Sequence, residues 1–124
     1  MRARSMVVAV VVLLFTSSAG MAQDYDQYGA IAYSMKTKRF GYSTGEGSRY
    51  DAEQSALGYC RAADCRIQLW FRNTCAAFAT GDNGTITGWG YDSNPRKARQ
   101  RALNECKKRG SDCRVLVEAC TNDE

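Results

Sequence analysis

The nine-residue stretch AEQSALGYC (residues 52–60) recurs 46 residues later as ARQRALNEC (residues 98–106). In both copies the alanines, the leucine and the cysteine are spaced as on one face of a helix. A Gly-aromatic block precedes each copy (residues 40–43 and 89–92), and a block that begins Cys-Arg follows each copy (residues 65–67 and 113–115). Because ordered internal repetition indicates a duplicated structural unit, we expect the chain to fold as two copies of one unit.

Each unit is predicted to consist of a β-hairpin, a helix and a closing strand. The expected strands are residues 29–33, 39–43 and 66–71 in the first unit, and 76–79, 85–91 and 114–120 in the second. Asn83-Gly84 supplies the positive φ values that a tight turn of the second hairpin needs. The fold class expected is therefore α+β, with two pseudo-repeated ββαβ units, an antiparallel sheet, two helices and disulfide staples.

Capping residues mark where both helices begin. Ser48 is the expected N-cap of the first helix, with Asp51 as a capping-box partner. Asn94 is the expected cap of the second helix, where Pro95 takes the first helical position and Gly110 ends the helix.

Six cysteines in 124 residues are typical of an exported, disulfide-stabilised domain. Cys60 and Cys65 flank one short turn, and Cys106 and Cys113 flank another, so these two pairs fit disulfide geometry. Cys75 and Cys120 remain, and their bond would tie the two units together. A zinc site is the alternative, but the spacing lacks CxxC knuckles. No metal and no cofactor are expected.

The N-terminal residues have the pattern of a secretory signal peptide. Arg2 and Arg4 precede an apolar run over residues 6–15, and Gly20-Met21-Ala22 offers small residues for cleavage. A transmembrane anchor would need about 20 apolar residues, and no second run of that kind follows. We therefore expect a signal peptide over residues 1–22 and one exported domain over 23–124, periplasmic or secreted. Its units would span about residues 28–75 and 76–120.

The blocks of residues that define the units resemble the bacterial "domain of unknown function 4189" family. The resemblance rests on Tyr28-Gly29-Ala30-Ile31-Ala32-Tyr33, on Ala56-Leu57 and Ala102-Leu103 with the cysteines that follow them, and on Gly88-Trp89-Gly90. It extends from about residue 28 to residue 120. It implies a small exported domain and no set of catalytic residues. In this chain Ala76 follows Cys75, where members often have glycine.

The composition removes most catalytic chemistry. The chain contains no histidine, which excludes Ser-His-Asp and Cys-His catalysis and histidine metal ligation. Glycoside cleavage needs two carboxyl groups, and Glu46 with Asp82 is the pair we consider for a small cell-wall hydrolase. Nothing in the sequence places these two groups together. The prediction is that the protein is not an enzyme, with the hydrolase as the alternative.

Charge is concentrated in the second helix. Without residues 1–22 the net charge is +2, yet residues 95–109 alone carry seven cations against Glu105. A solvated helix surface would explain this, but so would a surface that binds an anionic partner. We expect a non-catalytic module that binds a protein or an anionic envelope component, inhibitor-like or immunity-like, and not nucleic acid. The sequence leaves its oligomeric state open. The residues expected to contact the partner are Arg96, Lys97, Arg99, Arg101, Lys107, Lys108, Arg109 and Trp89.

Overall fold

The computed structural model describes residues 25–121, in which eight elements follow one another as two ββαβ units. The expected signal peptide lies outside these residues. The first unit comprises β1 (Tyr28–Tyr33), β2 (Phe40–Glu46), α1 (Arg49–Cys60) and β3 (Arg66–Arg72). The second comprises β4 (Cys75–Gly81), β5 (Ile86–Asp92), α2 (Pro95–Lys107) and β6 (Arg114–Cys120). The expected α+β class and the repeated units are confirmed.

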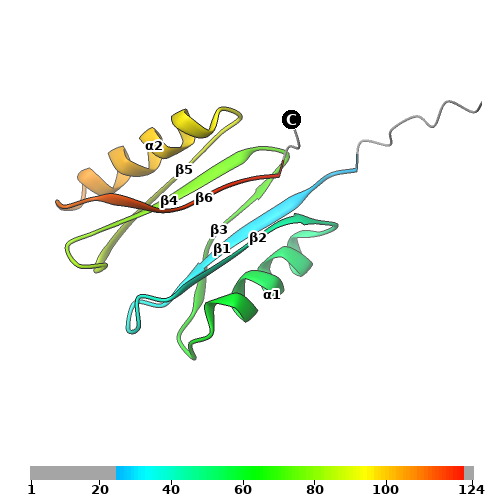
Figure 1. Ribbon diagram of the computed structural model, residues 1–124, viewed down its shortest axis with the longest axis horizontal. Coiled ribbons are helices and arrows are strands. Elements are labelled where there is room, and N and C mark those ends of the chain that lie inside the picture. Colours follow the sequence, from blue (N-terminus) through cyan, green and yellow to red (C-terminus); the bar gives the residue numbers. More distant parts are fainter. Residues whose placement is uncertain (1–24, 122–124) are drawn as a thin grey trace, which may run out of the picture.

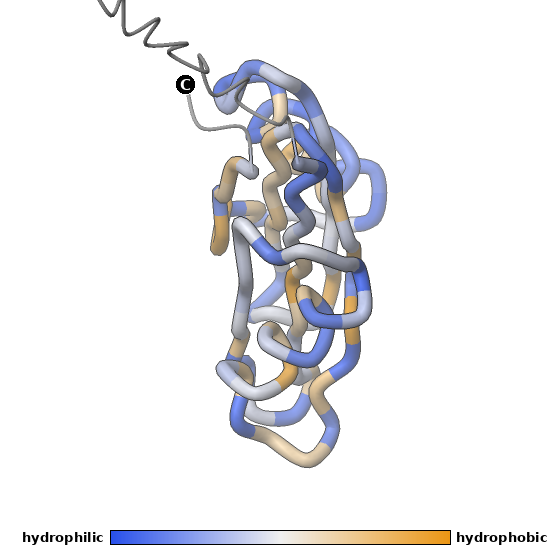
Figure 2. Tube along the Cα trace, turned by 90° about the vertical axis from the view of Figure 1, so that its right-hand side faces the viewer, coloured by the Kyte–Doolittle hydropathy of each residue, from blue (hydrophilic) through white to orange (hydrophobic). Residues whose placement is uncertain are grey.

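The six strands divide into two three-stranded antiparallel sheets, one from each unit. Their orders are β2-β1-β3 and β5-β4-β6, so the first strand of each unit is the central one. Figure 1 shows the two sheets stacked against each other, with α1 and α2 on the two outer sides. The layers therefore run helix, sheet, sheet, helix. Turned by 90°, the molecule is narrow and elongated, with hydrophobic positions along the strands and hydrophilic positions at most turns (Figure 2).

Each layer boundary has its own buried cluster. Between the sheets lie large side chains, namely Ile31, Tyr33, Leu69, Phe71, Phe78 and Val117, together with two alanines of the second unit. Between each sheet and its helix lie alanines and cysteines, such as Ala30 and Ala56 in the first unit. Large residues therefore fill the space between the sheets, while small ones allow each helix to lie close to its own sheet.

An equivalent glycine lies directly under each helix. A Cβ added to Gly41 would lie 2.2 Å from the carbonyl oxygen of Ala56, and one added to Gly88 would lie 2.3 Å from the amide nitrogen of Cys106. Both helices pass directly over these strands. The two glycines are therefore equivalent, 47 residues apart. The alignment of residues 40–43 with residues 89–92 in the sequence was therefore wrong by two residues. Because side chains of a strand alternate between its two faces, a shift of two residues leaves each side chain on the same face, and the sequence pattern does not reveal the shift.

Both N-caps form as expected. The Ser48 hydroxyl accepts from the amide of Asp51 at 3.0 Å, and the Asn94 side chain accepts from the amide of Arg96 at 2.9 Å. Pro95 occupies the first turn of α2. Gly110 lies just past the end of this helix, and its amide donates to the carbonyl of Cys106 at 3.1 Å.

All six cysteines are in disulfides, in the pairs that their spacing favours: Cys60–Cys65, Cys106–Cys113 and Cys75–Cys120. The first two join the end of each helix to the start of the next strand. The expectation that the third bond would tie the units together was wrong. Cys75 opens β4 and pairs in register with Cys120 of β6, so this bond lies within one sheet. The cause is that Cys75 already belongs to the second unit.

Candidate functional site

A groove of about 550 Å³ runs between α2 and β5, the edge strand of the second sheet. Along the groove the helix lies directly on Gly88 and Gly90, where a Cβ on either would collide with α2. The residues lining the groove come from the strand and from the helix with the turn after it. They are Gly88, Trp89, Gly90, Tyr91, Arg101, Asn104, Glu105, Lys108 and Arg109. The structure therefore brings four of the expected partner-contacting residues to one place.

Trp89 and Tyr91 line the groove from β5, and their side chains lie on the face of the strand away from α2, because Gly88 and Gly90 face the helix. The Trp89 side chain is 42% exposed and meets the Tyr91 ring edge-on, with the ring centres 5.2 Å apart. The Tyr91 hydroxyl donates to the carbonyl of Trp70 on β3 at 2.8 Å. Burial raises the pKa of Tyr91, which favours the neutral hydroxyl that donates this hydrogen bond. Trp89 thus rests on a ring that is anchored to the opposite sheet.

Three of the seven expected cations face a carboxylate, two from neighbouring strands and one from α2 itself. Arg101 lies 3.4 Å from Asp92, and Arg99 lies 3.2 Å from Glu118. Lys108 lies 2.8 Å from Glu105, and this hydrogen bond lowers the pKa of the Glu105 carboxyl. Exposed pairs of this kind contribute about 0–1 kcal/mol each. Their cations can therefore exchange these carboxylates for those of a partner at small cost.

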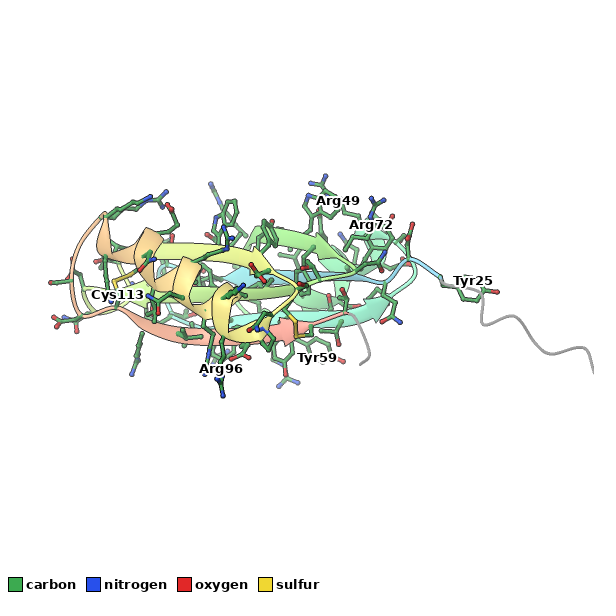
Figure 3. All side chains as sticks on the ribbon, turned by 90° about the horizontal axis from the view of Figure 1, so that it is seen from above. Tyr25, Arg49, Tyr59, Arg72, Arg96 and Cys113 are labelled. Atoms are coloured by element: carbon green, nitrogen blue, oxygen red, sulfur yellow. A yellow bond between two sulfur atoms is a disulfide. The ribbon has the colours of Figure 1, made fainter. Side chains whose placement is uncertain are left out.

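The other four cations lack a carboxylate partner among residues 25–121. Arg109 donates to the carbonyl of Thr87 at 3.2 Å, which fixes its guanidinium at the rim of the groove. Arg96, Lys97 and Lys107 are exposed on the outer side of α2. Figure 3 shows the Arg96 side chain extending away from the body of the protein. Positive charge consequently continues from the groove over the outer surface of the helix.

The first unit has the same groove with different chemistry. Between β2 and α1 a groove of about 420 Å³ is lined by Phe40, Tyr42, Tyr59 and Glu46 among others. This groove contains no cation. In the helices, Asp51 and Glu53 occupy the positions of Lys97 and Arg99, 46 residues on. The shared backbone therefore carries two different surfaces, and of these two grooves the one in the second unit is lined by a tryptophan and cations. In the first unit Arg49 lies over the Trp70 ring, but neither residue lines the groove.

The structure separates the two carboxyl groups considered for hydrolysis. Glu46 pairs with Tyr28 at the start of β1, whereas Asp82 lies in the turn that contacts Tyr33 at the end of β1. The length of β1 between them is roughly 16 Å, at ~3.3 Å per residue. A glycosidase holds its carboxyl groups about 5–9.5 Å apart. Asp82 instead accepts hydrogen bonds from the amide and hydroxyl of Ser111, at 3.2 and 3.0 Å.

Two further features bear on function. Within residues 25–121, no group of three Cys, Asp or Glu side chains gathers in a way that could hold a metal ion. Over the same residues, no helix has the length and hydropathy needed to cross a membrane.

Comparison with known proteins identifies a similar structure and a family, but neither has a stated activity. No curated protein matches this chain. The chain resembles the NMR structure of Rv1813c from Mycobacterium tuberculosis, with a TM-score of 0.57 and 24% sequence identity, over 97% of this chain and 96% of that one. The model of the family described as "Domain of unknown function (DUF4189)" matches residues 28–120. The chain therefore belongs to the DUF4189 family.

Proposed function

We propose that this protein is an exported, non-catalytic module whose α2–β5 groove binds an acidic segment of a partner protein. The observation that carries the proposal is the grouping of Arg101, Lys108 and Arg109 along one groove, whose lining on β5 includes the half-exposed Trp89. Tryptophan and arginine are the residues that most often dominate binding energy at protein interfaces. The cations along the outer side of α2 would also steer an acidic partner toward the groove.

A non-catalytic role agrees with the side chains that the fold provides. The chain has no histidine, and its six cysteines are all in disulfides, so no thiolate is available as a nucleophile. Glu46 and Asp82 lie at opposite ends of the strands. A protein of this kind acts by occupying a surface of its partner, which is the action of an inhibitor or an immunity protein.

Export is proposed from two independent features. Residues 1–22 have the charged start, apolar middle and small-residue end of a secretory signal, with cleavage after Ala22. Three disulfides require an oxidising compartment, such as the periplasm or the medium. Mass spectrometry of the protein purified from the medium or the periplasm would give the mature N-terminus. A chain retained in the cytoplasm with residues 1–22 intact would contradict this part.

Peptide binding tests the recognition of an acidic segment. The probe is a fluorescently labelled peptide of glutamates around one phenylalanine, and the readout is anisotropy at low ionic strength. The test variant combines Lys97→Glu, Arg101→Glu and Lys108→Glu, because these residues share one side of α2. We expect saturable binding that the variant weakens at least tenfold, since the loss of even one charge-assisted hydrogen bond costs about 1.5–3 kcal/mol.

The matched control changes net charge equally but away from the groove. It combines Lys36→Glu, Arg61→Glu and Arg66→Glu, three exposed cations of the first unit. Equal weakening by both variants would show that only net charge matters and would contradict the proposal. So would binding unaffected by Trp89→Ala, or binding to anionic phosphatidylglycerol vesicles in place of the peptide.

A further inference from the structure

A second cavity, separate from the α2–β5 groove, opens at one end of the layer between the two sheets. Its volume is about 480 Å³, within the range of small-ligand pockets. Three segments far apart in the sequence form it: the end of β1 with the turn after it, the end of β4 with the turn after it, and the start of β6. The argument below uses Tyr33, Lys38, Thr80, Gly84, Asp112 and Arg114 from its lining, together with Leu116.

The base of this cavity is apolar and rigid. The Tyr33 side chain is 1% exposed, its ring lies 5.2 Å from that of Phe78, and its hydroxyl donates to the carbonyl of Gly84 at 2.8 Å. Leu116 packs against the same cluster of buried side chains. Beside them Thr80 is 5% exposed, and no other group of residues 25–121 hydrogen-bonds its hydroxyl. The hydroxyl of Thr80 is thus free to donate to a ligand.

Lys38 is held over the cavity by the opposite turn. It has a left-handed backbone (φ 63°), and its ammonium donates to the carbonyls of Met35 and Gly84. A Cβ on Gly84 would lie 2.8 Å from Lys38 Cδ, so the lysine stem packs directly on this glycine. The ammonium contacts only neutral carbonyl oxygens here, and its positive charge is not compensated by a carboxylate of residues 25–121. Little side-chain entropy remains to be lost when a ligand binds.

Arg114 supplies the second positive charge. It pairs in register with Thr80, so the two side chains lie on the same side of the second sheet. Burial raises the pKa of the Tyr33 hydroxyl, and the positive charge of the Arg114 guanidinium lowers that pKa by a smaller amount. No carboxylate of residues 25–121 lies within ion-pair distance of Arg114, and Asp112 is the one acidic residue of the lining. Two cations therefore face one carboxylate across a concave surface.

We propose that this end cavity binds a small oxyanion, either a phosphate or a carboxylate group, between Lys38 and Arg114. The planar guanidinium of Arg114 suits bidentate contact with such a group, and the Lys38 ammonium adds a point charge. Thr80 donates a further hydrogen bond from the base, and an apolar body on the ligand would contact Leu116. The site is independent of the α2–β5 groove, because none of its residues belongs to α2 or β5.

NMR titration of the full domain with inorganic phosphate, and separately with acetate, tests the site and distinguishes the two oxyanions. We expect saturable shifts of the amides of Thr80, Asn83, Gly84 and Arg114, with a Kd on the order of 1 mM for the preferred anion. Arg114→Gln and Lys38→Met should each weaken binding about tenfold or more, since each removes at least one charge-assisted hydrogen bond.

The repeat provides matched controls for both variants. Arg66 is the first residue of β3 and corresponds to Arg114, the first residue of β6, but Arg66 does not line the cavity. Lys36 belongs to the same turn as Lys38 and does not line the cavity either. Arg66→Gln and Lys36→Met should leave the affinity unchanged. Shifts that do not saturate, shifts centred on α2, or equal weakening by these controls would overturn the proposal. Shifts confined to the end cavity would support it even if the acidic peptide fails to bind α2.

Discussion

The close contact of α2 with β5 predicts that Gly88→Ala destabilises the protein strongly. The added methyl would lie 2.3 Å from the amide nitrogen of Cys106, 2.5 Å from the carbonyl oxygen of Ala102 and 2.9 Å from the Cα of Cys106. All three atoms are helix backbone, so the whole helix must move to make room. Overpacking of a rigid core costs about 1–3 kcal/mol, and backbone collisions lie at the upper end. For a domain of this size we expect a loss of roughly 10–20 °C in Tm.

Gly58→Ala is the matched control for this substitution. Gly58 lies in α1, and a Cβ there meets no atom within 4 Å. Alanine in a helix is favoured over glycine by about 0.5–1 kcal/mol, so this variant should be more stable than the parent. The measurement is thermal unfolding followed by circular dichroism with all disulfides intact. A Gly88→Ala variant as stable as the parent would refute the close contact between helix and sheet.

Three further predictions concern the disulfides and the titrating groups. Replacing Cys75 and Cys120 with alanine should lower the free energy of unfolding, measured in urea, by about 4 kcal/mol. Removing either local disulfide should lower it by about 2–2.5 kcal/mol, because the loop that Cys75–Cys120 closes is much longer. Equal losses for the three disulfides would contradict this ranking. Burial raises the pKa of Tyr33 and Tyr91, so in an absorbance titration both phenols should ionise above the ordinary tyrosine pKa of about 10. The stability due to their neutral forms should be complete below about pH 10 and fall as the pH rises further. The hydrogen bond from Ser34 lowers the pKa of Asp64, so Ser34→Ala should raise that pKa in a carbon-detected NMR titration; an unchanged pKa would show that the bond is absent in solution.

The parts of the fold that local sequence determines were predictable. Ser48, Asn94 and Pro95 mark helix starts through hydrogen bonds that span only a few residues, and the two local disulfides cross single short turns. The third disulfide shows where this reasoning ends. The pairing of Cys75 with Cys120 follows by elimination. Whether this bond joins the two units depends on the strand to which Cys75 belongs, and the chain reversal at Asn73 (φ 51°) places Cys75 in the second unit.

The candidate sites were predictable only in part. Trp89 and the cations of α2 were expected to contact the same partner, but Arg101 and Arg109 lie 12 and 20 residues from Trp89, and the groove that they line together was not predicted. Asp92 and Glu118, which pair with cations of α2, come from strands, and no helical spacing indicates those ion pairs. Lys38 and Arg114 lie 76 residues apart and meet only because the sheets stack. No local pattern marks that cavity.

The stacking of the two sheets follows from what one unit leaves uncovered. In the first unit α1 covers the side of β1 that bears Ala30 and Ala32, while Ile31 and Tyr33 point to the other side. A lone unit would expose that second side to water, which costs about 25 cal/mol of free energy for each Å² of apolar surface. The second unit presents Phe78 and Val117 at the corresponding place, and burial of both surfaces removes the cost. Duplication thus provides each sheet with a partner and leaves both helices, with the grooves beside them, on the outside. That arrangement lets the surface of one helix become cationic while the packing between the sheets stays the same.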